Sequence, residues 1–273
     1  MEPSDSEILQ SVQYCFPSNN ASCRKEQRSA SAYSALYTGM GATVVLTVCG
    51  NLLVIISISH FKQLHTPTNL ILLSLAVADF LVGMTVLPLT MTALIETCWY
   101  FGGMLCSLYL LLDSVLISVS LSNLVLIAID RYFAICDPLF YSTKISVNLM
   151  HLLILFSWHV RLISSFKDKN KETTYKISKI SERKAAKTLG IVVFVFFFCW
   201  LPYYIWTFTS TNVNMSLITF YFSPVVIVYL NSCINPIIYA LFYPWFQKSV
   251  KLILTFKICY RESSFVNLFP DHN

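Results

Sequence analysis

Two aspartates lie in a stretch that is otherwise apolar enough to cross a membrane. Residues 111–132 read LLDSVLISVSLSNLVLIAIDRY, with Asp113 near one end and Asp130 near the other. On an α-helix the 17 positions between them span about 25 Å, so the carboxylates would lie near opposite faces of a bilayer. Ionisable groups inside a membrane span are costly and usually mark function. Asp113 is suited to pairing with a cation, and Asp130 to restraining the neighbouring Arg131 by charge.

The composition predicts an integral membrane protein of the all-α class. Of the 273 residues, 56% are hydrophobic and only 12% are charged, about half the charge of a typical soluble domain. Residues 1–28 are polar and lack the apolar core of a cleavable signal peptide, so we expect the first span to direct insertion. Long apolar runs predict a bundle of membrane-spanning helices. The five predicted spans are Tyr33–Ser59, Thr68–Thr92, Met104–Ile129, Thr188–Thr209 and Leu217–Phe242.

A sixth stretch, residues 147–166, is too short in its apolar core to predict a full crossing. The basic segment 161–187, with nine Lys and Arg against three acidic residues, is predicted to be cytoplasmic, which places the N-terminus outside. Three spans that start outside end inside, so a full crossing by 147–166 would move the basic segment outside. We therefore expect five full crossings plus one partial or surface-lying helix. Asn20, in Asn-Ala-Ser, is then a candidate glycosylation site, the alternative being an unmodified surface Asn.

Oxygen-bearing side chains recur at similar depth in three of the predicted spans. Asp79 lies in the second span and Ser120 midway along the third, and the last span carries Asn231, Ser232 and Asn235. Oxygen ligands suit a hard cation, so a small monovalent cation such as sodium is the favoured occupant. A neutral, hydrogen-bonded core carboxyl is the alternative for Asp79.

Short motifs along these spans resemble those of the rhodopsin-type G-protein-coupled receptors. The motifs are GN (Gly50-Asn51), LAVAD ending at Asp79, DRY (Asp130–Tyr132), CWLP (Cys199–Pro202) and NPIIY (Asn235–Tyr239). Asn231–Phe246, NSCINPIIYALFYPWF, further resembles the fingerprint NSxxNPxxYxxxYxWF of the trace amine-associated receptors. The resemblance implies a bundle of the seven-helix receptor type.

The resemblance assigns the outer polar residues to an amine pocket. Asp113 would pair with the ligand ammonium, and the Tyr229 hydroxyl would bond that carboxylate. Trp200 would form the floor of the pocket, and Tyr203 and Tyr204 its aromatic wall. Cation–π attraction would add about 0.5–2 kcal/mol. The alternative is that these aromatics only pack the spans.

On the inner side, the resemblance implies a switch that acts on a heterotrimeric G protein. Arg131 would insert into the G protein once its partners Asp130 and Glu182 release it. Phe196 would repack, and Pro202 would kink its helix into a pivot. Tyr132 and Tyr239 complete the DRY and NPIIY parts of this switch. Residues 244–257 resemble the amphipathic helix that lies on the inner leaflet.

The sequence departs from this family between Trp158 and Glu182. Trp158 resembles the central tryptophan of the fourth span, and Glu182 already belongs to the sixth helix, only 24 positions later. The outer half of span four, the second outer loop and span five are therefore missing, a deletion between about 159 and 180. The chain divides into an outer tail, 1–32, the bundle, 33–260, and a cytoplasmic tail, 261–273.

This loss affects the cysteines that the resemblance would pair. Cys106 resembles the cysteine that bonds the missing outer loop, and Cys15 and Cys23 resemble a further pair associated with that loop. An oxidising exterior permits substitutes, either Cys15–Cys23 or Cys98–Cys106. No Cys/His spacing in the sequence suggests zinc.

The resemblance implies a multi-pass plasma-membrane receptor for trace or biogenic amines that raises cyclic AMP. Its partners would be a small amine, a heterotrimeric G protein, membrane lipid and, as an option, a second receptor copy, but not nucleic acid. We expect no cofactor besides an allosteric sodium ion, and no enzyme activity. One alternative is a non-signalling truncated product, retained in the endoplasmic reticulum or paired with full-length receptors. Another is a transporter or channel that uses Asp79 and Asp113 as a relay.

Overall fold

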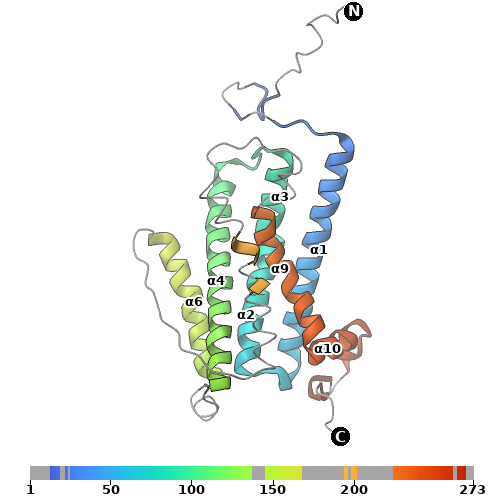
Figure 1. Cartoon of the computed structure of the whole chain (residues 1–273), viewed down its shortest axis with the longest axis vertical. Helices are drawn as coiled ribbons and strands as arrows, with labels where there is room; N and C mark the ends of the chain where they lie inside the picture. Colours follow the sequence, from blue (N-terminus) through green and yellow to red (C-terminus); the bar gives the residue numbers. More distant parts are fainter. Residues whose placement is uncertain are drawn as a thin grey trace, which may run out of the picture.

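A computed structural model describes residues 13–18, 22–23, 25–136, 145–167, 194–195, 198–201, 224–260 and 263–268. These residues form a bundle in which α2 lies between α1 and α4 (Figure 1). The helices confirm the predicted all-α class. The long helices are α1 (Ala30–His60), α2 (Pro67–Leu81), α3 (Leu87–Glu96), α4 (Gly102–Cys136), α6 (Val147–Lys167), α9 (Pro224–Phe242) and α10 (Pro244–Leu254).

Three helical stretches in the described part of the chain are long and apolar enough to cross a membrane. They are Ala30–His60, Pro67–Glu96 and Gly102–Ala134, and they coincide with the first three predicted spans. A fourth results if Val226–Phe242 and Pro244–Leu254 count as one span, although they meet at 101°. Most of the predicted span Thr188–Thr209, and residues 217–223 of the last one, lie outside the described residues.

The sixth stretch forms α6, which packs along one edge of the bundle against α4 and α2 (Figure 1). Its apolar part is the short helix Val147–His159. Trp158 packs against Val115 and Val119 of α4, and its Nε1 donates to Ser74 Oγ of α2 at 3.1 Å. Of the two predicted alternatives, these contacts favour the partial helix.

Small side chains let the helices approach each other closely. A Cβ atom added at Gly50 of α1 would lie 2.9 Å from Pro236 Cβ of α9, and one added at Gly83 would lie 2.9 Å from Thr47 Cγ2 of α1. Membrane helices use glycine for such close packing because lipid offers no hydrophobic drive to bring them together. Gly50 of the GN motif therefore has a packing role between α1 and α9.

The helices begin where the sequence provides caps. Ser29 accepts a hydrogen bond from Ala32 N at the start of α1, and Thr66 accepts one from Asn69 N at the start of α2. Between α2 and α3 a π-helical turn, η2 (Val82–Val86), interrupts the regular pattern. Such turns are frequent at functional sites. This one directly precedes the turn of α3 that carries Thr90.

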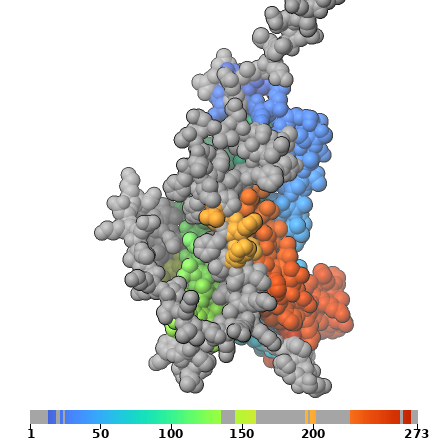
Figure 2. All heavy atoms as spheres, viewed as in Figure 1, coloured from blue at the N-terminus to red at the C-terminus, as the bar shows by residue number. Residues whose placement is uncertain are grey.

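The YxWF end of the fingerprint forms the bend between α9 and α10. Trp245 and Phe246, in the first turn of α10, are buried in the largest apolar cluster together with Val54 and Ile58 of α1. The contacts of α1 with α9 and α10 make these helices one continuous side of the molecule (Figure 2). Burial of two large aromatic side chains therefore fixes α10 against α1.

Candidate functional site

The structure brings Asp113 and Tyr229 together from helices far apart in the sequence. The Tyr229 hydroxyl of α9 donates to Asp113 Oδ1 of α4 at 2.8 Å. Tyr229 is only 4% exposed, whereas Asp113 is half-buried. The carboxylate is thus held in place on one oxygen, and within the described residues no hydrogen bond holds the other.

Two further hydroxyls extend this pair, and sequence reasoning missed both. Thr90 Oγ1 lies 3.4 Å from the Tyr229 hydroxyl and 3.0 Å from the Tyr109 hydroxyl. Tyr109 precedes Asp113 by four residues on α4, so helical spacing places both on one face and could have identified it. Thr90 has no comparable signal, because only the packing of α3 against α4 and α9 brings it there.

The remaining predicted pocket residues are only partly described. Trp200 is half-buried against the largest apolar cluster, which also contains Ile238 and Tyr239 of α9. Tyr203 and Tyr204 lie outside the described residues.

Asp79 lies at the centre of a polar cluster buried between α2, α4 and α9. Its side chain is 0% exposed. Oδ1 accepts from Ser232 Oγ at 2.7 Å and from Ser120 Oγ at 3.5 Å, and Oδ2 accepts from Asn235 Nδ2 at 2.7 Å. Asn231 is buried in the neighbouring turn of α9. Three of the four predicted partners therefore bond the carboxylate directly.

The donor set of this cluster fits a small hard cation. Within the described residues no Lys or Arg pairs with Asp79, although a buried charge is costly without a counter-charge. Two buried oxygens, Asn51 Oδ1 and the Tyr239 hydroxyl, have no hydrogen-bond partner among the described residues. Asn51 Nδ2 is itself fixed on Ser232 O at 3.0 Å. If sodium binds, Asp79, Ser120 and Ser232 are the residues placed to hold it.

At the inner end of α4, Asp130 and Arg131 form an ion pair that α2 reinforces. Arg131 Nη2 lies 2.6 Å from Asp130 Oδ2, and Nε lies 3.0 Å from the same oxygen. Thr68 Oγ1 donates to that oxygen at 2.7 Å and also contacts Arg131 Nη2. Thr68 was not among the predicted residues, since its role depends on where the first turn of α2 meets α4.

Of the other predicted switch residues, the structure describes Tyr239 and Tyr132. Tyr239 is buried with its ring 5.9 Å from that of Tyr243 and 6.5 Å from that of Phe246, between centroids. Tyr132 is half-buried beside Phe133. Glu182, Phe196 and Pro202 lie outside the described residues.

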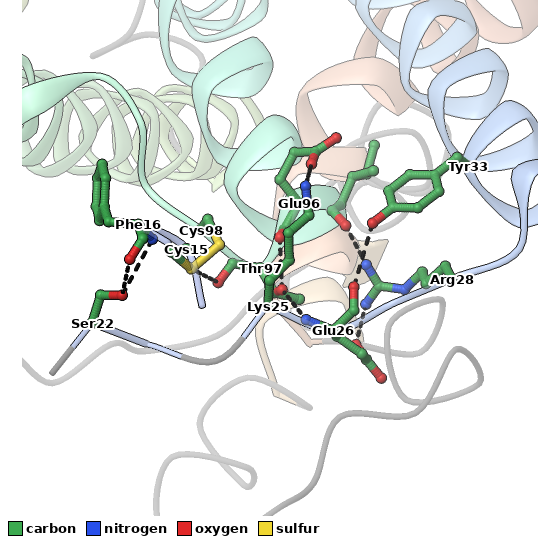
Figure 3. The surroundings of a disulfide bond; sticks show 11 residues. Cys15, Phe16, Ser22, Lys25, Glu26, Arg28, Tyr33, Glu96, Thr97 and Cys98 are labelled. Atoms are coloured by element: carbon green, nitrogen blue, oxygen red, sulfur yellow. Dashed lines mark hydrogen bonds and ion pairs between the residues drawn. A yellow bond between two sulfur atoms is a disulfide. The ribbon is translucent and has the colours of Figure 1, made fainter. Parts of the chain in front are cut away.

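Both predicted substitute disulfides are wrong, because Cys15 bonds Cys98 (Figure 3). The backbones of residues 13–15 and 23–25 pair through Cys15 N to Cys23 O at 2.8 Å. This pairing leaves Cys23 exposed and buries Cys15 against the loop after α3. Cys106 lies inside the first turns of α4 as a free thiol. Asn20 lies outside the described residues.

Comparisons with known proteins agree with the motifs. The profile of the 7 transmembrane receptor (rhodopsin family) matches residues 50–168 and 162–239. Trace amine-associated receptor 13c of Danio rerio is 34% identical over 94% of this chain and 96% of its own length. Trace amine-associated receptor 4 of Mus musculus is 32% identical over 96% of both chains. Trace amine-associated receptor 7c of Rattus norvegicus is 36% identical over 96% of this chain and 93% of its own.

The alignments to these relatives are longer than this chain. The alignment to the Danio rerio receptor runs over 328 positions, so at least 55 of them face a gap in this chain of 273 residues. The family profile matches as two separate segments that meet at residues 162–168. This point falls within the predicted deletion, after Trp158.

The membrane-length helices, the five motifs in family order and the matches along nearly the whole chain agree with one another. The two segments that match the family profile overlap at residues 162–168, between Trp158 and Glu182. The chain belongs to the rhodopsin family of seven-transmembrane receptors, in the trace amine-associated group, and is therefore a membrane receptor and not an enzyme.

Proposed function

We propose that this chain is a receptor for small protonated amines and that Asp113 is the counter-ion for the ligand ammonium. The observation that carries the proposal is the 2.8 Å hydrogen bond from the Tyr229 hydroxyl to Asp113 Oδ1. The names of its relatives, trace amine-associated receptors, support the same ligand class.

The arrangement suits an ammonium ion for three reasons. Tyr229 holds one carboxylate oxygen, so the other can accept from the ligand without reorganising the site. Asp113 is half-buried, which strengthens its attraction for a cation relative to bulk water. The ring of Tyr109, which is half-buried one turn before Asp113 on α4, would add cation–π attraction to an organic cation at this carboxylate.

We further propose that amine binding releases Arg131 toward a heterotrimeric G protein and raises cyclic AMP. The ligand would contact α4 and α9, and the Asp79 cluster joins these two helices to α2 below the pocket. A shift of α4 relative to α2 would separate Arg131 from Thr68. A sodium ion on Asp79 would bind the inactive arrangement and oppose this shift.

The test is amine-evoked cyclic AMP in cells that express the chain at a quantified surface level, with phenethylamine as the first probe. We expect a response that Asp113→Asn abolishes. Arg131→Ala should remove the cyclic AMP signal while amine binding to purified chain persists. A flat response of the unmodified chain with confirmed surface expression would overturn the proposal.

A second candidate function follows from the missing segment. The alignment gap and the free Cys106 favour a chain that is retained in the endoplasmic reticulum, or that pairs with full-length receptors, without signalling. Glycans at Asn20 separate this candidate from a plasma-membrane receptor. Mature, endoglycosidase-resistant glycans would count against retention, and only high-mannose glycans would support it.

A further inference from the structure

A second carboxylate with a tyrosine partner lies at the outer mouth of the bundle. Glu96 ends α3, and its Oε1 accepts from the Tyr37 hydroxyl of α1 at 2.7 Å. Its Oε2 is 2.7 Å from the Lys25 ammonium of the N-terminal segment (Figure 3). The same ammonium lies 5.7 Å from the centroid of the Tyr100 ring. The chain's own lysine therefore sits between a carboxylate and an aromatic ring.

This outer group has the same chemistry as the pair of Asp113 and Tyr229. In both places a tyrosine hydroxyl holds one carboxylate oxygen at 2.7 or 2.8 Å. In the outer group the other oxygen already binds a primary ammonium, that of Lys25. A site that holds a lysine ammonium in this way has the features that recognise any alkylammonium ion.

We propose that Glu96, Tyr37 and Tyr100 form a second, outer amine site, which Lys25 fills until a ligand ammonium displaces it. This inference goes beyond the proposed function, since the outer site involves neither Asp113 nor signalling. The ligand class is an organic ammonium ion with an aromatic or aliphatic body.

Displacement of Lys25 is feasible because its ion pair is open to water. The side chains of Lys25 and Glu96 are 27% and 19% exposed. Ion pairs that solvent reaches contribute little, since the Coulomb gain is screened and two side chains lose freedom. A competing ammonium therefore needs to overcome only a weak internal contact.

The N-terminal segment does not depend on Lys25 to stay in place. The Cys15–Cys98 disulfide anchors it before this residue, and Glu26 N donates to Thr97 Oγ1 at 2.9 Å just after it. Arg28 Nη1 also donates to Ile95 O. The Lys25 side chain can thus leave Glu96 while the backbone around it keeps its contacts.

The experiment measures binding of N,N-dimethyl-4-fluorophenethylammonium to the full chain in lipid nanodiscs by ¹⁹F NMR. Asp113→Asn is the background in which only the outer site remains. In this background we expect weak binding that Lys25→Met strengthens two- to fivefold, because the internal competitor is gone. Glu96→Gln should abolish the remaining binding, with or without Lys25.

Glu26→Gln is the matched control. Glu26 is a neighbouring carboxylate that pairs with Arg28 at 2.5 Å instead of with a lysine, and we expect its loss to leave probe binding unchanged. The proposal is overturned if Lys25→Met leaves the affinity unchanged, or if Glu96→Gln binds the probe as well as the Asp113→Asn background does. Formation of the Cys15–Cys98 bond in each variant, read by mass spectrometry, checks that the outer segment is intact.

A second measurement needs no substitution at Lys25 or Glu96. The probe is a tertiary amine that acylating reagents do not consume, so it can be added during acetylation of lysines. We expect saturating probe to raise the acetylation rate of Lys25 at least twofold, since displacement frees its ammonium from Glu96. Lys62, over the Phe265 ring on the opposite side of the bundle, should not change. An unchanged rate at Lys25 would also overturn the proposal.

Discussion

Replacing Tyr229 by Phe tests how much of the amine affinity comes from the positioning of Asp113 and how much from its charge. The change removes the hydroxyl that donates to Asp113 Oδ1 at 2.8 Å and keeps the aromatic ring. The carboxylate retains its charge but gains freedom to rotate. Immobilising one such side chain when the ligand binds costs about 0.5–1.5 kcal/mol. Amine affinity should therefore fall about 2- to 12-fold. Asp113→Asn removes the charge itself. Loss of one partner of a desolvated pair costs about 2–5 kcal/mol, so it should weaken affinity at least about 30-fold.

The assay is equilibrium binding of a radiolabelled amine to the chain in nanodiscs, which does not require signalling. Tyr109→Phe is the matched control, because its hydroxyl contacts Thr90 and not Asp113. It should change affinity less than Tyr229→Phe does. Equal losses for Tyr229→Phe and Asp113→Asn would refute the division into charge and positioning. So would an unchanged affinity in Tyr229→Phe.

Three further predictions test the inner switch, the helix packing and the outer disulfide. Thr68→Val removes a hydrogen bond to the charged pair of the DRY motif, worth about 1.5–3 kcal/mol, so basal cyclic AMP should rise about tenfold or more at equal surface expression. No rise would mean that Thr68 does not restrain the arginine. Gly50→Ala should destabilise the bundle by about 1–3 kcal/mol, since its Cβ would meet Pro236. Gly39→Ala, where a Cβ meets nothing within 4 Å, should not lower the thermal unfolding temperature, since alanine favours a helix over glycine by about 0.5–1 kcal/mol. Equal losses in the two variants would contradict the packing argument. Non-reducing peptide mapping should recover Cys15 linked to Cys98, and a Cys98–Cys106 peptide would exclude this pairing.

The amine site shows how far residue types and a family resemblance lead. Asp113 and Tyr229 were predicted as partners, and the structure places them 2.8 Å apart. Thr90 and Tyr109 were missed, although they continue the same polar chain. Tyr109 was within reach of helical spacing, whereas Thr90 depends on the π-helical turn between α2 and α3. A local irregularity in one helix changes which face meets its neighbours, and no single-helix pattern contains that information.

For the outer cysteines, in contrast, the predicted partners were wrong. Four outer cysteines allow several pairings, and the two that were predicted, Cys15–Cys23 and Cys98–Cys106, join residues close along the chain. The observed partners are 83 positions apart, and their Cα atoms lie 5.6 Å from each other. Proximity in space, which alone permits a disulfide, comes here from the backbone pairing of residues 13–15 with 23–25 and from their docking on the loop after α3.

The amino-acid sequence by itself determined that this protein is helical, crosses a membrane and carries polar residues at the outer, central and inner depths of its spans. These are local properties, because a bilayer of fixed thickness selects apolar runs of fixed length and makes every polar exception conspicuous. Only the tertiary structure decided that α6 packs against α4, that Thr68 joins the ion pair of Arg131, and that the Lys25 ammonium pairs with the Glu96 carboxylate. Each of these contacts joins residues at least 60 positions apart or separate helices, so it depends on how complete helices pack and not on any neighbourhood along the chain.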